Sequence, residues 1–302
     1  MGNNILVSCS VLSYNSAKTI LETLESIKAQ TYQNIELIVS DDCSKDNTVE
    51  LCRQWIAANK NRFTRVVLLT VQENTGVCAN GNRAMAACQG KWQKSIAADD
   101  ILLTNCIGDF VDFVNNNTHI KWIASKVAVY NDNFKDDCCT QRNLVYDKSF
   151  FNMDVGQQLK YMACTNPIIA PSLFFDLEFK RSLGGYDETY GYEDRPFYIK
   201  ALENGYKCYF LDKVTVGYRI HQSMSNSTSQ LFNYSFLKKT RIFEREKCFS
   251  YLTKKQILLK NTLWIIQDIF QYAGLNRKKP QFVAFLYKSM LFMIIRMLKN
   301  RR

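Results

Sequence analysis

Histidine is rare in this 302-residue chain, which has two, and several common binding motifs are missing. No CxxC pair occurs among the eleven cysteines, which disfavours a structural zinc site. No GxGxxG follows the first apolar segment, so a dinucleotide cofactor is not expected. A P-loop is excluded as well, because GNRAMAACQGK has Met85 where that motif has its first glycine.

The chain also lacks the features of an exported protein. The N-terminal segment MGNNILVSCS has neither the basic region nor the long apolar run of a secretory signal. The cysteines are odd in number and have no regular spacing, so free thiols in a reducing compartment are favoured over a disulfide framework. An apolar content of 47% is ordinary for a globular chain. We therefore expect a folded cytoplasmic protein.

Charge is not spread evenly along the chain. The 39 basic and 28 acidic side chains give a net charge of +11, yet residues 1–237 hold 23 basic and 25 acidic ones. Residues 238–302 hold the other 16 basic side chains and 3 acidic ones. A domain that wraps nucleic acid spreads Lys and Arg over its surface. Because the body of the chain is slightly acidic, nucleic acid is excluded as its partner.

Apolar runs alternate with helix-like segments in the N-terminal part of the chain. The apolar runs cover residues 5–14, 35–40, 65–71 and 92–98. Segments of helical periodicity lie between them, the first over 15–30. This order predicts an α/β fold with a mainly parallel sheet and helices on both faces. In such sheets, ligands bind at the carboxyl ends of the strands.

Polar pairs follow three of the four apolar runs. These pairs are Tyr14-Asn15, Asp41-Asp42 and Asp99-Asp100. Asn15 and Asp41-Asp42 are also good turn and helix-cap residues, an alternative that stays open for each pair taken singly. Asp99 and Asp100 follow a buried strand directly, and two adjacent carboxylates repel unless a cation lies near. Mg²⁺ or Mn²⁺ commonly binds one or two carboxylates together with substrate phosphates, so the sheet edge is predicted to bind a divalent cation and a diphosphate.

Four segments resemble glycosyltransferase family 2, whose members have the GT-A fold and use nucleotide sugars. The opening signature of the family resembles SVLSYNSAKTILETLESIKAQTYQNIELIVSDDCSKDNT, and its metal motif resembles IAADD. Its acceptor-side motif resembles SLGGYDETYGYEDRPFYIKALENGYK, and the match closes with YRIHQSMSNS. The order and spacing of the four segments make the resemblance specific over residues 5 to 226. It implies a Rossmann-like nucleotide-binding GT-A domain of the kind used in bacterial surface-polysaccharide synthesis.

The resemblance also implies roles for the residues at the strand ends. Tyr14 and Asp42 would contact the nucleotide base, most often uracil, while Asn15 would shape the loop. Asp99 and Asp100 would hold the ribose and the divalent cation, Mn²⁺ or Mg²⁺.

The resemblance also implies roles for four further residues, which lie in the loop 76–83, in the acceptor-side motif and in the last matching segment. Asp194 would be the catalytic base, and Glu193 and Asn82 would lie on the nucleotide-sugar side. His221 would face the metal or the diphosphate. Glu193-Asp194 is also a good helix start, and both roles can hold together. A structural hydrogen bond beside Arg219 is the open alternative for His221.

Two positions depart from the family pattern. Ala97 stands where many members have a further Asp, so Asp99-Asp100 would suffice for the cation. Gly81-Asn82 stands where many members have an Arg-Asn pair, and Arg83 comes next.

The basic tail is expected to be helical. Residues 231–252 and 254–274 have helical periodicity, and the second segment ends at Gly274. Pro280 then opens a largely apolar segment. Its narrow polar stripe consists of Gln281, Lys288, Arg296 and Lys299.

This last segment is no clean transmembrane span, because Lys288 and Arg296 interrupt an apolar run at the short limit for a bilayer. Basic clusters at 277–279 and 301–302 instead favour an amphipathic helix on an anionic membrane, where each charge contributes about 1 kcal/mol. Packing on the catalytic domain or on a second subunit, as in a homodimer, is the alternative that stays open.

Two domains are therefore expected: a GT-A catalytic domain over 1–230 and a basic, amphipathic helical extension over 231–302. The leading hypothesis is an inverting glycosyltransferase of the hexosyltransferase class. It would move a sugar from a nucleotide diphosphate donor, foremost a UDP-sugar, to a lipid-linked saccharide at the inner face of the cell membrane, in capsule or lipopolysaccharide synthesis. The alternatives are a nucleotidyl- or phosphosugar transferase of similar fold and a catalytically inactive membrane-associated scaffold. Residues 130–190 are expected to select the sugar and the acceptor.

Overall fold

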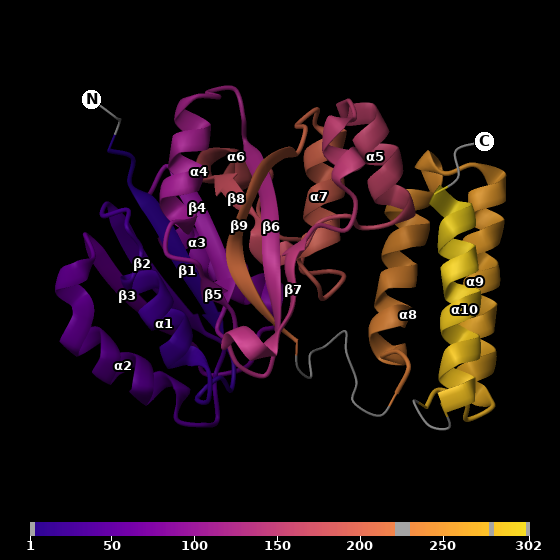
Figure 1. Ribbon diagram of the computed structural model, residues 1–302, viewed down its shortest axis with the longest axis horizontal. Coiled ribbons are helices and arrows are strands. Elements are labelled where there is room, and N and C mark those ends of the chain that lie inside the picture. Colours follow the sequence, from indigo (N-terminus) through magenta and orange to yellow (C-terminus); the bar gives the residue numbers. More distant parts are fainter. Residues whose placement is uncertain (1–3, 221–229, 278–280, 300–302) are drawn as a thin grey trace. The chain divides into compact units, whose positions relative to one another are not determined.

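The chain divides into two compact units. The structure, a computed structural model, describes residues 4–220, 230–277 and 281–299. The first unit comprises Met1–Gln158 and Pro167–Ile220. The second unit comprises Leu159–Asn166 and His221–Arg302. The first unit holds the sheet, and the second holds the C-terminal helices (Figure 1).

Over the described residues, the first unit is built on one sheet of nine strands. They are β1 (Val7–Ser13), β2 (Ile35–Asp41), β3 (Arg65–Thr70), β4 (Trp92–Ala97), β5 (Ile101–Leu102), β6 (Trp122–Asn131), β7 (Cys139–Leu144), β8 (Phe174–Asp176) and β9 (Tyr209–Ile220). Their order is β3-β2-β1-β4-β8-β6-β9-β5, and β7 pairs with β6. The strands from β3 to β4 are all parallel. Beyond β4 the sheet is mixed, because β8 is antiparallel to both its neighbours while β6 and β9 are parallel.

Seven α-helices connect or follow these strands in the part of the chain that the structure describes up to residue 220. They are α1 (Ile20–Lys28), α2 (Thr48–Asn59), α3 (Val77–Ala87), α4 (Cys106–Asn115), α5 (Val155–Cys164), α6 (Leu177–Ser182) and α7 (Asp194–Glu203). The four apolar runs predicted as strands are confirmed as β1 to β4. The first helix begins at Ile20 rather than at residue 15, because the preceding residues form a turn in which Thr19 N–H donates to the Ser16 carbonyl.

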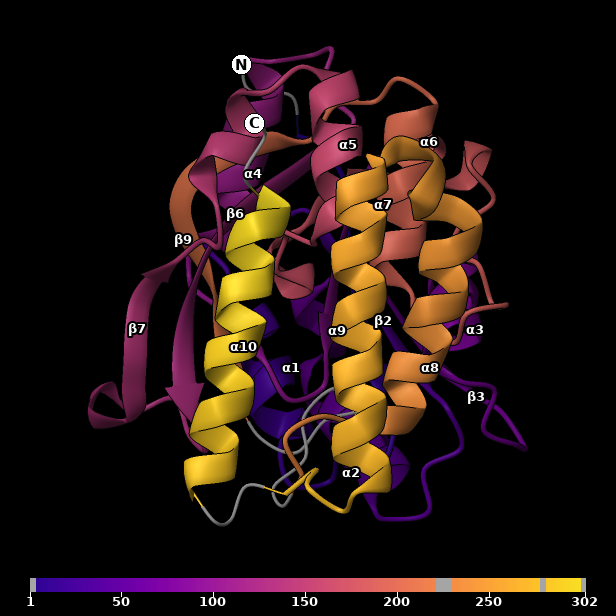
Figure 2. The ribbon, with the colours of Figure 1, turned by 90° about the vertical axis from the view of Figure 1, so that its right-hand side faces the viewer.

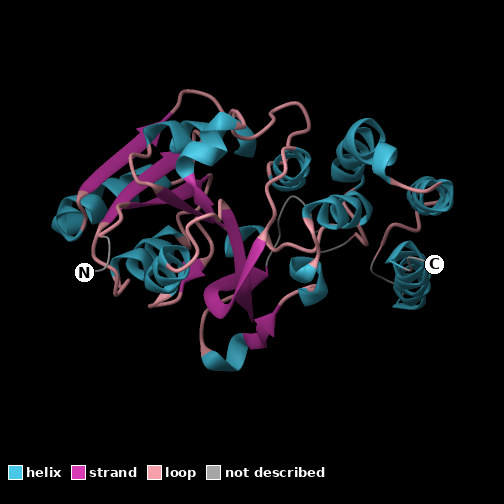
Figure 3. Ribbon diagram, turned by 90° about the horizontal axis from the view of Figure 1, so that it is seen from above, coloured by secondary structure: helices cyan, strands magenta, loops and turns pink. Residues whose placement is uncertain are grey.

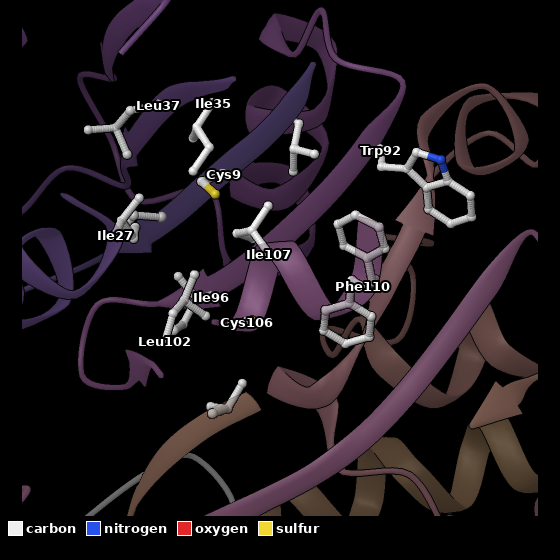
Figure 4. Packing of buried hydrophobic residues seen from close by; sticks show 14 of the residues in the cluster. Cys9, Ile27, Ile35, Leu37, Trp92, Ile96, Leu102, Cys106, Ile107 and Phe110 are labelled. Carbon is white, nitrogen blue, oxygen red and sulfur yellow. The ribbon is translucent and has the colours of Figure 1, made fainter. Parts of the chain in front are cut away.

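Each face of the parallel strands has its own apolar core, because successive side chains of a strand point to opposite faces. On β2, Leu37 belongs to the large cluster that contains Ile27 of α1 and Phe110 of α4 (Figure 4). The next residue, Ile38, packs on the other face in a cluster with Met85 of α3. Helices therefore cover both faces of this part of the sheet, as the sequence pattern predicts (Figure 3).

The second unit contains the three helices predicted for the tail (Figure 2). They are α8 (Tyr234–Phe243), α9 (Lys254–Tyr272) and α10 (Gln281–Lys299). A capping box between Thr253 and Gln256 begins α9. The helices share a cluster that contains Phe232, Phe270 and Tyr287.

Helix α10 has two different sides. Its inner side includes Tyr287, Ile294 and Leu298, which are buried. Its outer side exposes Phe282, Phe285, Leu286, Phe292, Met293 and Met297. By length and composition alone, Gln281–Leu298 is apolar enough to cross a membrane, and 17% of this window is buried.

Candidate active site

The carboxyl ends of β1, β2 and β4 lie side by side at one edge of the sheet. Ser13 at the end of β1 is in register with Asp41 of β2, and Leu12 is in register with Ala97 of β4. The predicted site residues that follow these three strands are Tyr14, Asn15, Asp42, Asp99 and Asp100. The parallel topology thus brings the three polar pairs to one edge, as expected for ligand binding in such sheets.

Asn15 fixes the loop that follows β1. Its backbone N–H donates to Ser44 Oγ at 2.8 Å, and its Oδ1 accepts from the Lys45 N–H at 2.7 Å. Its φ of 51° lies in the left-handed region, which asparagine tolerates better than most residues. The loop presents Tyr14, whose side chain is 49% exposed. An exposed aromatic ring on a fixed loop is a suitable surface for stacking a nucleotide base.

Asp42 is a buried carboxylate held by donors from its own chain. It accepts from the backbone N–H of Thr75 at 3.1 Å, from that of Gly76 at 2.8 Å and from Thr75 Oγ1 at 2.6 Å. Arg83 Nη2 lies 3.0 Å from Asp42 Oδ1. Burial acts to raise the pKa of Asp42, but the hydrogen bonds from Thr75, Arg83 and Gly76 outweigh it and lower that pKa. Asp42 is therefore an ionised group in a fixed position.

Asp99 and Asp100 are held by Arg219 at the end of β9. The Arg219 N–H donates to Asp100 Oδ1 at 2.9 Å, and Arg219 Nε donates to the Asp99 carbonyl at 2.8 Å. Thr23 Oγ1 of α1 donates to the Asp100 carbonyl at 2.7 Å. Burial and the charge of Asp99 raise the pKa of Asp100 well above its ordinary value. A bound cation would offset both effects.

The chemistry of this pair fits a divalent cation. Asp99 and Asp100 offer hard oxygen ligands, and a buried carboxylate beside a second one gains from a positive charge. Among the described residues, no group of three or more His, Cys, Asp or Glu side chains gathers as a metal site. Two carboxylates suit a cation that takes its other ligands from water and substrate phosphates. The further predicted ligand, His221, lies outside the described residues.

Glu193 and Asp194 stand at the N-terminus of α7. Asp194 is the first residue of this helix, and one of its carboxylate oxygens accepts from the Arg195 N–H at 2.6 Å. A helix N-terminus favours the ionised form of a carboxyl group. Burial and then the charge of Asp194 raise the pKa of Glu193. The assignment of Asp194 as the base stays a prediction.

Asn82 joins α3 to the loop that precedes α7. Its Nδ2 donates to the Tyr186 carbonyl at 2.9 Å and to Glu188 Oε1 at 3.0 Å, and its Oδ1 accepts from the Tyr186 N–H at 2.8 Å. Two glycines allow this close approach. A Cβ on Gly81 would lie 2.7 Å from the Tyr186 ring, and one on Gly185, whose φ is 70°, would lie 2.5 Å from Asn82 Oδ1. The side-chain amide of Asn82 thus holds the loop before α7 in place. The assignment of Asn82 to the nucleotide-sugar site stays a prediction.

Two residues that organise this site were missed in the sequence. Thr75 lies in the polar segment QENTG that follows β3. This segment is a fourth polar cluster at a strand end, and it could have been recognised from the sequence. Arg219 was noted only as a neighbour of His221, although it holds both Asp99 and Asp100. Its partners lie more than a hundred residues away in the chain, and no local pattern records such a contact.

Comparisons with known proteins agree with this geometry. The family described as "Glycosyl transferase family 2" matches residues 8–166. The chain is 25% identical over 296 residues to an uncharacterized glycosyltransferase of Haemophilus influenzae, covering 96% of this chain and 88% of that protein. It is 26% identical over 221 residues to the UDP-Glc:alpha-D-GlcNAc-diphosphoundecaprenol beta-1,3-glucosyltransferase WfaP of Escherichia coli, covering 72% of this chain and 78% of that protein.

A solved structure shares the fold. TarS of S. aureus, in complex with UDP-GlcNAc, superposes with a TM-score of 0.60 at 21% sequence identity. The match covers 79% of this chain and 65% of that chain. The GT-A fold expected from the sequence is thereby confirmed.

Proposed function

Because this chain belongs to glycosyl transferase family 2 and is a glycosyltransferase, we propose that it transfers a sugar from a UDP-sugar to a saccharide acceptor and inverts the anomeric centre. One observation carries the proposal: a single sheet edge presents the exposed Tyr14 ring, the fixed Asp42 carboxylate and the Asp99-Asp100 pair. The ring suits a base, Asp42 suits its polar edge, and the acidic pair suits a cation on a diphosphate. The UDP-GlcNAc in the complex of TarS, which shares the fold, supports uracil as the base.

Asp99 and Asp100 would hold the divalent cation, Mn²⁺ or Mg²⁺, with His221 as a further candidate. When bound, such a cation supplies positive charge against the diphosphate leaving group. The chain supplies the orientation, because Arg219 and Thr23 fix the segment that carries both carboxylates.

Asp194 would act as the general base. It accepts the proton of the acceptor hydroxyl while that oxygen bonds to the anomeric carbon and the bond to the diphosphate breaks. A positioned base contributes about 10²–10⁴ to the rate. It stands at the start of α7, where the helix dipole favours a negative charge. Glu193 precedes it and would face the sugar nucleotide.

The acceptor is proposed to be a lipid-linked saccharide in surface-polysaccharide synthesis. The name of the Escherichia coli relative WfaP specifies a diphosphoundecaprenol-linked acceptor. Such a substrate lies at the inner face of the cell membrane, and residues 130–190 of this chain would select the sugar and the acceptor.

The second unit is proposed to attach to that membrane surface. The outer side of α10 exposes apolar side chains such as Phe285 and Phe292, and Lys288 and Arg296 are exposed on the same helix. Apolar side chains enter the headgroup region while long basic side chains reach the anionic surface. The inner side of α10 is already covered by its own unit, so the helix would lie along the membrane.

A thermal-shift screen of UDP-, GDP- and dTDP-sugars, each with Mn²⁺ or Mg²⁺, tests the donor. We expect a UDP-sugar with metal to stabilise the protein by about 2.7 kcal/mol at a hundredfold excess over Kd. Asp100→Asn should lose the stabilisation that depends on the metal, and Asp112→Asn, at an exposed position of α4, is the matched control. If no donor stabilises the protein, the donor assignment is wrong. Product analysis separates the alternatives, since glycosyl transfer releases UDP, phosphosugar transfer releases UMP, and a scaffold releases neither.

Flotation with vesicles tests the membrane proposal. Full-length protein should float with phosphatidylglycerol-containing vesicles and less with pure phosphatidylcholine, and added salt should weaken binding. Phe292→Ser should reduce flotation, whereas Tyr146→Ser, on an exposed aromatic of the first unit, should not. Equal flotation of both variants would contradict the proposal. A shift of Phe292→Ser from dimer to monomer in light scattering would instead assign this face to a second subunit.

A further inference from the structure

Lys180 of α6 is a fully buried lysine that the mechanism above does not use. Its Nζ donates to Gln93 Oε1 at 2.9 Å and to the Tyr186 hydroxyl at 3.0 Å. It also lies over the rings of Tyr186 and Phe175, 4.1 and 5.0 Å from their centroids. All these partners are neutral, and no carboxylate of the described residues lies within ion-pair distance of Lys180. Burying an ammonium group without an ion pair costs folding free energy, which suggests that Lys180 is kept in this position for a function.

Lys180 and Glu193 act on each other's charge. Burial lowers the pKa of Lys180 to about 7, and the charges of Cys88 and then Glu193 act against this shift. Conversely, Lys180 acts to lower the pKa of Glu193, against burial and the charge of Asp194. Lys180 thus acts electrostatically on Glu193.

Lys180 also fixes the loop that leads to this pair. Tyr186 is held at its backbone by Asn82 and at its hydroxyl by Lys180. Gln93, which accepts from Lys180, donates in turn to Ser10 Oγ at 2.9 Å in β1. A buried polar chain therefore runs from the sheet through Lys180 to the loop before α7.

We propose that Lys180 is a positioning residue for glycosyl transfer: its hydrogen bond anchors Tyr186 in the loop that leads to α7, and its positive charge opposes the negative charge of Glu193, the neighbour of Asp194. This inference rests on the proposed function of Asp194. Other titratable groups interact with the pair or with Lys180. Cys88, at the end of α3, acts on Lys180. The charges of Glu193 and Asp194 act on Cys78 of α3, Tyr186 of the loop and Tyr198 of α7, and those of Asp187 and Glu188 also act on Cys78.

The pH profile of kcat/KM in Lys180→Met tests this role, because methionine keeps the length of the side chain and removes its charge. Loss of the cation raises the pKa of the carboxyl pair, so the acidic limb of the profile moves to higher pH. If the limb moves by one pH unit, kcat/KM at any pH on the acidic limb is about tenfold lower than that of the wild-type protein. UDP affinity should stay unchanged. Tyr186→Phe removes the anchor but keeps the charge, so its kcat should fall without a shift of the limb.

An unshifted acidic limb in folded Lys180→Met would overturn the proposal. Should this variant not fold, ¹³C-NMR titration of the lysine side chains in wild-type protein and Glu193→Gln replaces it. The pKa of Lys180 should fall in Glu193→Gln, since a negative neighbour is lost, and an unchanged pKa overturns the proposal. This measurement needs no turnover. It therefore separates failure of the Lys180 role from failure of the proposed transferase reaction, which would appear as no sugar transfer by the wild-type protein.

Discussion

The two units of this protein bury and expose different kinds of side chain, although the second unit also buries one ion pair, Lys260 with Glu244. The first unit buries charged groups, among them Glu36, Asp42 and Lys180, and gives each a set of hydrogen-bonding partners. The second unit exposes apolar groups. Among the described residues, twelve of the sixteen large apolar side chains that are exposed belong to this smaller unit.

This difference separates two tasks. A buried charge with several partners has a fixed position, which is what a reaction at a defined atom requires. An exposed apolar side chain has no such restraint and gains free energy only when another apolar phase covers it. The contrast supports the proposals that the first unit carries the chemistry and that the second unit attaches to a membrane, and substitutions in each unit test whether the two tasks are independent.

The largest effect is expected in the first unit at Asp194. Asp194→Asn keeps the shape of the side chain but removes its ability to accept a proton, so kcat should fall by about 10²–10⁴. Donor-induced thermal stabilisation and flotation with vesicles should stay at wild-type levels. Asp112→Asn, a substitution of the same type at an exposed position of α4, is the control. Unchanged turnover of folded Asp194→Asn would remove Asp194 from the mechanism.

A smaller effect is expected from the buried ion pair of the second unit. Lys260 Nζ lies 2.7 Å from Glu244 Oε1, and both side chains are buried. Glu244→Gln leaves the ammonium without its counter-ion and should cost about 3 kcal/mol of unfolding free energy in urea titrations. The double variant Glu244→Gln/Lys260→Met should recover most of this loss. Exposed Glu246→Gln is the control, and an equal loss there would argue against a special role for the pair.

The smallest effect is expected at Glu36 at the start of β2. This buried carboxylate accepts from Ser8 Oγ at 2.5 Å, the Gly90 N–H at 2.9 Å and Arg65 Nη1 at 2.8 Å. Burial acts to raise the pKa of Glu36, but these bonds outweigh it and lower that pKa. Glu36→Gln should cost about 2 kcal/mol at neutral pH.

The pH dependence of that loss has a defined sign. A lowered pKa stabilises the folded state above the unfolded pKa, about 4.3, and the contribution is lost as pH falls through the folded value. Wild-type unfolding free energy should therefore drop more steeply below this pH than that of Glu36→Gln. Glu73→Gln, at an exposed position, should follow the wild-type curve. Parallel curves for wild type and Glu36→Gln would contradict the lowered pKa.

The parts of the fold with a periodic pattern were predictable from the sequence. Strands β1 to β4 are six or seven residues long and separated by helices, so their order implies parallel pairing and one polar edge. The tail helices were predictable for the same reason. Strands β5 and β8 have two and three residues, too few for a pattern, and the mixed half of the sheet depends on them. Lys94 and Lys180 were not predictable as core residues, because their buried state depends on acceptors supplied by distant segments.

Helix α3 and the loop before α7 are in direct contact at two glycines. Gly81 lies against Tyr186, and Gly185 lies against Asn82. At both places a hydrogen atom takes the room of a side chain, so helix α3 and the loop before α7 touch without a flexible spacer between them. The N-terminus of α3 follows the segment that binds Asp42, and the loop leads to Glu193. A displacement of α3 would therefore pass through direct contact to the loop that leads to the carboxyl pair.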